Sequence, residues 1–320
     1  MGGQRWDPLH GASDRSDGQF WMGGAVEHEE QPDEKRDRYL HDWNLTGEGD
    51  LQRPTTVEID DETLRDGLQS PSVRQPSLGE KLEILGRMGE LGIHAANIGY
   101  PGASATMLNH VIALAEATGG TDLAIQPNCA GRTHAADILP ISEAQQRSGV
   151  AIEAALFLGS SPIRQYVEGW DLDFLIRTTV EGVTLARRED LQVMYVTEDT
   201  TRARPEALRA VYTAAIEAGA RRICLADTVG HATPWGVRAL VKFARQIVAD
   251  SGEDVKIDWH GHRDRNLSVI NSLAALSAGA SRVHTCGLGI GERVGNTPTD
   301  TLLVNLKLLG WLDNELHSLP

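Results

Sequence analysis

From residue 54 onward, short apolar runs alternate with longer stretches whose apolar residues recur at helical spacing. The short runs predict strands that are buried on both faces, and the longer stretches predict amphipathic helices. The expected strands are 57–60, 94–98, 123–126, 151–158, 192–196, 222–225, 256–259 and 282–286. The expected helices are 78–91, 103–117, 134–146, 171–188, 205–218, 234–249, 267–278 and 299–309.

Eight strand–helix units in alternation favour an α/β protein built as a closed (β/α)8 TIM barrel. An open doubly wound sheet would instead require a glycine-rich turn after its first strand. Here the first strand is followed by the sequence ETLRDG at 62–67, which is not such a turn. We therefore expect a barrel over residues 53–320, with an active site at the carboxyl ends of its strands.

Residues 1–52 lack this alternation and are expected to form a separate N-terminal extension. They hold twelve acidic against five basic side chains, together with Gly-Gly pairs and scattered aromatic residues. One interpretation is a solvated, partly disordered segment. The other is an arm whose aromatic side chains dock on the barrel or on a second subunit. We expect the first for residues 1–30 and the second for residues 39–43.

The charge and the cysteines limit the partners and the compartment. A net charge of −15 disfavours nucleic acid or an anionic membrane as a partner. No apolar run is long enough to cross a membrane, and the N-terminus lacks a signal-peptide pattern. Cys129, Cys224 and Cys286 have no CxxC spacing, which is typical of reduced thiols in a cytoplasmic protein. A small anionic substrate would then need positive charge from a metal or from arginines.

Two histidines at the end of the seventh expected strand are candidate metal ligands. His260 and His262 are two residues apart, so an extended backbone points both imidazoles to one face. Closure of the barrel would bring them close to Asp66 after the first strand and to Asn296 after the last. Such a set suits Mg, Mn or Zn. The alternatives are an ion pair with Arg65 or a helix cap for Asp66, and a turn residue for Asn296.

Other polar side chains also follow the expected strands, where the site of a barrel is built. These candidates are Arg65, Gln69, Asn97, Tyr100, Ser160, Glu198 and Thr228.

Three segments resemble motifs of the DRE-TIM metallolyase superfamily. Residues 61–70 are similar to its TLRDGxQ motif, 260–264 to its HxHxD motif, and 289–296 to the GxGERxGN of its synthase branch. That superfamily includes isopropylmalate, homocitrate and citramalate synthases and hydroxymethylglutaryl-CoA lyase. The resemblance covers roughly residues 54–310 and implies a homodimer acting on small molecules.

The resemblance implies a metal-dependent Claisen-type condensation of an acyl-CoA, expected to be acetyl-CoA, with a 2-oxo acid. The products would be a 2-hydroxy acid of the alkylmalate type and CoA, so a CoA thioester is a co-substrate. Asp66, His260 and His262 would bind the metal, and Asn296 would lie at or near it. Arg65 would stabilise the developing enolate or alkoxide oxygen, and Glu198 would take part in proton transfer. The expected substrate contacts are Gln69, Asn97, Tyr100, Ser160 and Thr228.

Several positions depart from the synthase pattern. Leu68 stands where the synthases commonly have glutamate, Asn97 precedes 98–101 where they often have glutamate, and Ala155 stands where isopropylmalate synthases have histidine. These changes leave the identity of the 2-oxo acid open. Synthases also continue into helical and regulatory domains, whereas this sequence stops at Pro320, so we expect no feedback control through such a domain.

Two other functions are alternatives to condensation. The first is a lyase-type retro-aldol cleavage, but the loop of the lyases carries a reactive cysteine where this chain has Gly291. Cys286 lies before that loop and is expected in the core. The second is a non-catalytic barrel that binds a partner through its N-terminal arm and holds no metal.

Overall fold

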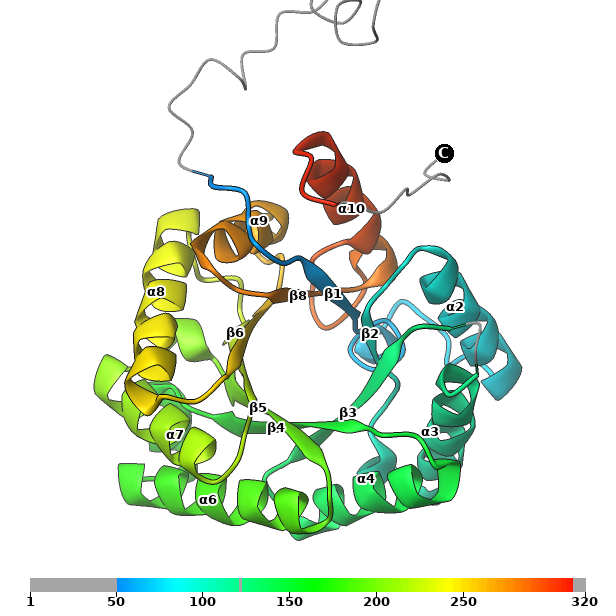
Figure 1. Ribbon diagram of the computed structural model, residues 1–320, viewed down its shortest axis with the longest axis horizontal. Helices are drawn as coiled ribbons and strands as arrows, with labels where there is room; N and C mark the ends of the chain where they lie inside the picture. Colours follow the sequence, from blue (N-terminus) through cyan, green and yellow to red (C-terminus); the bar gives the residue numbers. More distant parts are fainter. Residues whose placement is uncertain (1–50, 121–122, 313–320) are drawn as a thin grey trace, which may run out of the picture. The chain divides into compact units, whose positions relative to one another are not determined.

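The computed structural model describes residues 51–120 and 123–312, and the expectations for residues 1–30 and 39–43 lie outside these ranges. Eight parallel strands form a closed barrel in chain order (Figure 1), because β1 pairs with both β2 and β8. The strands are β1 Glu58–Asp61, β2 Ala95–Asn97, β3 Gln126–Arg132, β4 Glu153–Gly159, β5 Gln192–Glu198, β6 Arg222–Asp227, β7 Lys256–Gly261 and β8 Arg282–Thr285. The predicted TIM barrel is therefore confirmed.

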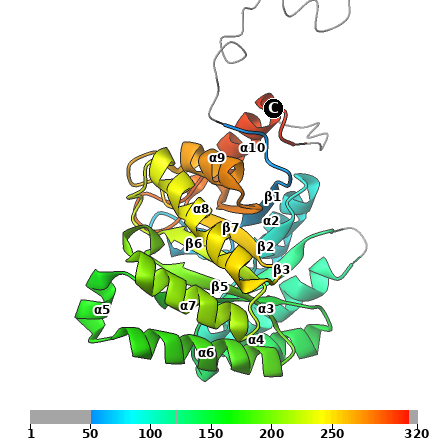
Figure 2. The ribbon, with the colours of Figure 1, turned by 60° about the vertical axis from the view of Figure 1, so that its left-hand side comes forward.

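The α-helices of the described residues surround this barrel. They are α2 Leu78–Glu90, α3 Ala105–Thr118, α4 Ala135–Ser148, α5 Pro162–Glu168, α6 Leu172–Arg188, α7 Pro205–Glu217, α8 Pro234–Ser251, α9 Ser268–Ala278 and α10 Thr299–Leu308. Figure 2 shows α6, α7 and α8 side by side on the outside of the sheet. Two of these helices begin with Pro205 and Pro234 at the first turn, where a missing N–H costs nothing.

The third strand was expected at 123–126, and this prediction is wrong. Leu123 and Ile125 are apolar but lie before the strand, which runs from Gln126 to Arg132. Its sequence, QPNCAGR, contains proline, asparagine and glycine, which are all depleted in strands. Pairing with both neighbours determines the strand here, since Ala95 pairs with Gln126 on one side and Asn128 with Glu153 on the other.

Helix α5, which precedes α6 after the fourth strand, was not predicted. The helix has seven residues, and its apolar side chains Ile163, Tyr166 and Val167 recur at helical spacing but are exposed, so the pattern is too short to distinguish a helix from a loop. Its N-terminus is nonetheless well defined, because the Ser161 side chain accepts a hydrogen bond from the Arg164 backbone N–H and Pro162 begins the helix.

Charged side chains occupy much of the barrel interior near the amino ends of the strands. TIM barrels usually place branched aliphatic residues in the interior. Arg282 on β8 is 1% exposed; its Nε lies 2.6 Å from Asp258 on β7 and its Nη2 lies 2.7 Å from Glu153 on β4. Strands β8 and β4 are not neighbours in the sheet, so the second contact crosses the interior. Arg222 on β6 adds a contact of 2.7 Å with Asp258. We name Glu153, Arg222, Asp258 and Arg282 the buried ionic cluster.

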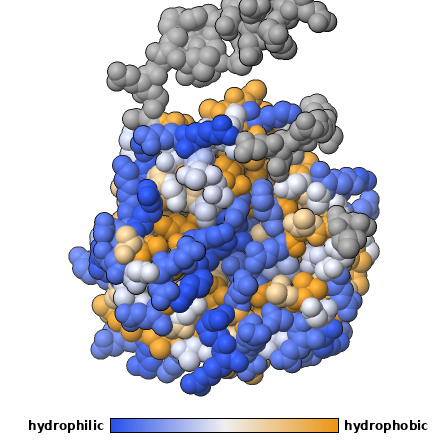
Figure 3. All heavy atoms as spheres, viewed as in Figure 1, coloured by the Kyte–Doolittle hydropathy of each residue, from blue (hydrophilic) through white to orange (hydrophobic). Residues whose placement is uncertain are grey.

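Figure 3, viewed down the barrel as in Figure 1, shows hydrophobic residues interspersed among hydrophilic ones on this end of the molecule. No described helix is both long and apolar enough to cross a membrane. At the start of the described chain, Leu51 packs against the barrel core and the Gln52 backbone N–H donates to Ser277 Oγ at 2.7 Å.

Replacing Arg282 tests how far the fold depends on the buried ionic cluster. Arg282→Met leaves Asp258 and Glu153 buried with one cation fewer, so we expect a loss of about 3–5 kcal/mol in the free energy of unfolding. Urea denaturation followed by circular dichroism measures it. The control is Arg147→Met, which breaks an exposed pair with Glu143 and should cost less than about 1 kcal/mol. Equal losses in the two variants would contradict this account.

Candidate active site

A cavity of about 250 Å³ lies at the carboxyl ends of the strands. Its wall has two chemically different parts. The apolar part comes from β3 to β6 and consists of Ala130, Ala155, Phe157, Met194, Val196, Cys224 and Ala226. The polar part consists of Glu62, Arg65, Asp66, Gln69, Asn97, Glu198, Thr228, His260, His262, His284 and Glu292. Such a cavity suits a small molecule with one polar and one apolar end.

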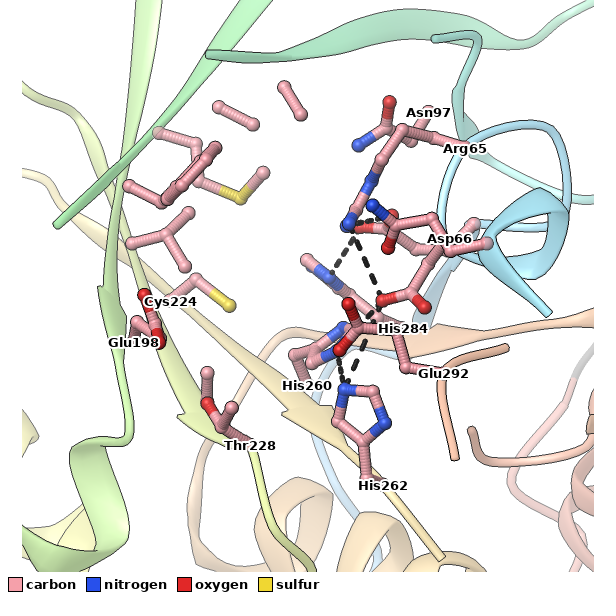
Figure 4. Close-up of a pocket in the computed structure, with 18 residues that line it drawn as sticks. Arg65, Asp66, Asn97, Glu198, Cys224, Thr228, His260, His262, His284 and Glu292 are labelled. Atoms are coloured by element: carbon pink, nitrogen blue, oxygen red, sulfur yellow. Dashed lines mark hydrogen bonds and ion pairs between the residues drawn. The ribbon is translucent and has the colours of Figure 1, made fainter. Parts of the chain in front are cut away.

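The structure brings together the three side chains expected to bind a metal (Figure 4). Nε2 of His260 and Nε2 of His262 lie 3.2 Å apart, and they lie 3.6 and 3.9 Å from Oδ2 of Asp66. The extended end of β7 points both imidazoles to the same side. Only β8 lies between β7 and β1 in the sheet, so Asp66 after β1 is close to them. One nitrogen or oxygen atom from each residue therefore faces a common point.

The protonation of this group suits a divalent cation. Burial lowers the pKa of His260 to about 3, with His262 contributing, and burial also lowers the pKa of His262. Burial opposes ionisation of Asp66, but Arg65 and then the two histidines hold its pKa below the usual value. Two neutral imidazoles beside one carboxylate are good ligands for Mg, Mn or Zn.

Unpaired buried atoms also fit a bound cation. Oδ1 of Asp66 and Oδ1 of Asn296 are buried without a hydrogen-bond partner in the protein. Folded proteins rarely leave such atoms unpaired, because desolvation of an unpaired polar group costs free energy. The residues present therefore fit a bound cation.

Asn296 lies beside this group, although it does not line the cavity. Its backbone forms an isolated bridge with His262, and its Nδ2 donates to the carbonyl of Ile290 at 3.2 Å. Gly291 has φ +148°, and a Cβ there would lie 2.1 Å from Nδ2 of Asn296 and 3.1 Å from Oδ1 of Asp66. Only glycine allows these two side chains to approach each other.

A second group of possible ligands, formed by Glu62, His260 and His284, shares one histidine with the first. Nδ1 of His284 lies 3.2 Å from Glu62 Oε1, and its Nε2 lies 3.1 Å from Asp258 Oδ2. Burial opposes the charged form, but the hydrogen bonds with Asp258 and Glu62 raise the pKa of His284 to about 10. A ring protonated on both nitrogens has no lone pair for a metal, so Asp66, His260 and His262 are the better ligand set.

Glu62 and His284 were not singled out from the sequence. One signal was available, because Asp258 and His260 on β7, and Arg282 and His284 on β8, alternate with buried apolar residues. Charged residues two apart on a fully buried strand face the same side, which in a barrel is the interior.

Arg65 places a permanent positive charge in the cavity. Its Nη2 donates to the Glu62 carboxylate, and its Nη1 lies 3.4 Å from Oδ2 of Asp66. Its Nε is buried and has no partner. Burial opposes ionisation of Glu62, but Arg65 and His284 hold the pKa of this carboxyl well below its usual range.

Three of the five expected substrate contacts line the cavity, namely Gln69, Asn97 and Thr228. Nδ2 of Asn97 is buried without a partner, so it can donate to a ligand. Oγ1 of Thr228 accepts from the Asp199 backbone N–H at 2.8 Å, which leaves its own proton free to donate. Glu198 lies across the cavity from Arg65 and Asp66 (Figure 4), and burial raises the pKa of its carboxyl, with Arg164 opposing.

Tyr100 and Ser160 are not among the residues that line the cavity. The Tyr100 hydroxyl donates to the Asp137 carboxylate, which is also paired with Arg132 at 2.7 Å. Burial and Asp137 raise the pKa of Tyr100 to about 12. Ser160 Oγ donates to the backbone carbonyl of Glu198 at 3.0 Å and so contacts the strand end that carries that carboxylate.

Comparison with known proteins gives matches to a family model, to curated relatives and to a solved structure. The sequence matches the family model described as HMGL-like over residues 56–318. It is 34% identical over 247 residues to a 2-isopropylmalate synthase of Methylacidiphilum infernorum, covering 77% of this chain and 48% of the relative. It is 36% identical over 252 residues to a 2-isopropylmalate synthase of Heliobacterium modesticaldum, covering 78% and 48%.

Among solved structures, hydroxymethylglutaryl-CoA lyase from Pseudomonas aeruginosa has the same fold, with a TM-score of 0.67 at 19% identity over 82% of this chain and 89% of that one. The chain spans about half the length of the curated relatives it matches. The DRE-TIM resemblance is confirmed, since the family model covers nearly the whole barrel. This chain belongs to the HMGL-like family, and its barrel is similar in sequence to those of 2-isopropylmalate synthases.

Proposed function

We propose that this protein catalyses a metal-dependent Claisen-type condensation of acetyl-CoA with a 2-oxo acid. The observation that carries the proposal is the buried Asp66–His260–His262 group beside Arg65, in a cavity lined by both polar and apolar side chains. The similarity to 2-isopropylmalate synthases supports the same reaction class. The expected products are a 2-hydroxy acid of the alkylmalate type and CoA.

Asp66, His260 and His262 would hold Mg, Mn or Zn, with the carbonyl oxygen of Asn296 at or near the ion. A bound divalent cation supplies Lewis acidity that polarises the keto group of the 2-oxo acid. Thr228 and Asn97 each offer a free donor to the substrate carboxylate, and Gln69 lies at the exposed rim. Together these contacts would fix the orientation of the keto carbon.

Arg65 would stabilise the oxygen on which negative charge develops. Its guanidinium stays ionised at every working pH, and the low dielectric of a closed cavity strengthens its attraction for an oxyanion. Its buried Nε has no partner in the protein and can donate to such an oxygen.

Glu198 would accept a proton from the methyl group of acetyl-CoA. The resulting carbanion attacks the keto carbon of the 2-oxo acid, forming one C–C bond, and the keto oxygen takes up a proton. Water then hydrolyses the thioester, which releases CoA and leaves a carboxylate. A buried carboxyl with a raised pKa suits this role, because proton transfer is most efficient when the base titrates nearer the working pH.

The environment of Cys286 favours condensation over the lyase reaction. Cys286 is fully buried and accepts a hydrogen bond from Asn296 Nδ2 at 3.4 Å, and burial raises the pKa of its thiol far above the usual value. It is therefore unsuited to act as a reactive thiol. Product analysis separates the two reactions, since a lyase would cleave a 3-hydroxy acid or its thioester. A non-catalytic barrel would give no product and bind no metal.

We further propose a homodimer in the cytoplasm. Cys129, Cys224 and Cys286 are all free and buried, as expected where thiols stay reduced. Gel filtration of the whole chain and of a truncation lacking residues 1–52 tests the assembly and the part that the extension plays in it.

The proposed ligand set predicts that the carboxylate of Asp66 is needed both for metal binding and for activity. Asp66→Asn removes the only carboxylate of the proposed ligand set, so calorimetry should show a large loss of Mn²⁺ affinity. Release of CoA from acetyl-CoA in the presence of a panel of 2-oxo acids should fall at least about 100-fold in kcat/KM, because the cation supplies several kcal/mol to the transition state.

Asp250→Asn is the matched control. Asp250 lies near the C-terminal end of α8, where it is exposed and pairs with Arg209 of α7, and it does not line the cavity. It should leave both measurements unchanged. The proposed function fails if the unaltered protein releases no CoA with any 2-oxo acid in the presence of Mg²⁺ or Mn²⁺.

The second prediction concerns pH. Because burial raises the pKa of Glu198 above 4.5, its proton-accepting form is lost as pH falls through that raised value. We expect kcat/KM to decline on the acidic side with this midpoint. Glu198→Gln should remove that decline and lower the rate by about 10²- to 10⁴-fold.

Glu181→Gln on the exposed face of α6 is the control and should keep the unaltered profile. An acidic decline that survives in Glu198→Gln with the same midpoint would assign proton transfer to another group.

A further inference from the structure

The position of Arg65 depends on one neighbouring carboxylate. Its Nη2 donates to Glu62, whereas its Nη1 lies 3.4 Å from Asp66 and its Nε has no partner. Asp66 is also the proposed metal ligand, so its charge would be shared with a cation. Glu62 therefore provides the firmest hold on the guanidinium.

Glu62 is itself held by the ring of His284. Glu62 follows β1 and His284 lies on β8, which is paired with β1. Oε1 of Glu62 lies 3.2 Å from Nδ1 of His284, while the other oxygen of the carboxylate, Oε2, accepts from Arg65. The two oxygens of one carboxylate thus contact two different side chains.

The far side of the His284 ring is anchored in the buried ionic cluster. Its Nε2 lies 3.1 Å from Oδ2 of Asp258, which also accepts from Arg282 Nε at 2.6 Å. Oδ1 of Asp258 lies 2.7 Å from Arg222 Nη1. The ring is 3% exposed and lies between carboxylates from the strands on either side of β8.

We propose that His284 is a positioning residue, which fixes Glu62 and, through Glu62, holds the Arg65 guanidinium at its place in the cavity. His284 thereby connects the buried ionic cluster to the arginine at the reacting end of the barrel. The kinetic part of this inference rests on the proposed function, whereas its structural part does not. Displacing an oriented catalytic group by about 1 Å can cost about 10²-fold in rate.

Two other roles for His284 make different predictions. If it only fills the core, its loss should lower stability without changing the kinetics. If it binds the cation with Glu62 and His260, its loss should weaken the affinity for Mn²⁺.

Kinetics of single and double variants test the positioning role. His284→Gln is expected to lower kcat about 10- to 100-fold while KM for the 2-oxo acid changes little. In a Glu62→Gln background the same substitution should have little further effect, because the residue through which it acts is already altered. His94→Gln is the matched control, since His94 is half-buried outside the cavity and accepts from the Ile59 backbone N–H. Additive losses in the double variant, or an unchanged kcat in His284→Gln, would overturn the proposal.

Crystal structures provide a test that does not need activity. In His284→Gln the Arg65 guanidinium should leave its position against Glu62 by about 1 Å or more, and Mn²⁺ affinity measured by calorimetry should stay unchanged. An unmoved guanidinium, or a large loss of Mn²⁺ affinity, would refute the inference.

These measurements also separate the two proposals. If the unaltered protein releases no CoA, the proposed function fails, and the crystal structures still decide the role of His284. If His284→Gln does not fold, Glu62→Gln replaces it, since removal of the charge that binds Arg65 should displace the guanidinium as well. An Arg65 that keeps its position in Glu62→Gln would likewise refute the inference.

Discussion

Pairing of β8 with β1 is the contact on which the candidate site depends. It closes the barrel and places Asp66, which follows β1, one strand away from His260 and His262 at the end of β7. These residues are almost 200 positions apart in the sequence, yet their ligand atoms come within 4 Å. The bridge between His262 and Asn296 then brings the last loop to the same point. Barrel closure and this bridge together assemble the proposed metal site.

Buried charge is the second constraint, and it has a cost. Ionic groups in the interior must be paired with opposite charges, because the free energy lost when an unpaired charge is desolvated is larger than the free energy gained by packing it. The buried ionic cluster compensates each acidic group with an arginine or with His284. It also provides a rigid polar base for the cavity, so that Glu62 and Arg65 keep fixed orientations. The apolar wall from β3 to β6 meets this base at Met194, whose Sδ lies 3.4 Å from Nη2 of Arg282.

Most of the barrel could be predicted from the sequence, because periodicity and capping act locally. The prediction failed for β3, whose residues are poor strand formers and are held by the neighbouring strands, and it missed α5, which buries nothing. Asp66, His260 and His262 lie close together as expected, because the segments that carry them follow strands whose carboxyl ends meet at one end of the barrel. Tyr100 and Ser160 did not reach the cavity, because side-chain direction at a strand end depends on the turn that follows. Glu62 and His284 were missed because only long-range pairing shows that they touch.

The most direct test of the central claim is a crystal structure of the protein with Mn²⁺ and a 2-oxo acid, with the metal located by its anomalous scattering. We expect one anomalous peak bound by Asp66, His260 and His262, with the 2-oxo acid between it and the apolar wall. A peak held by Glu62 and His284, or no peak at millimolar Mn²⁺, would contradict the account.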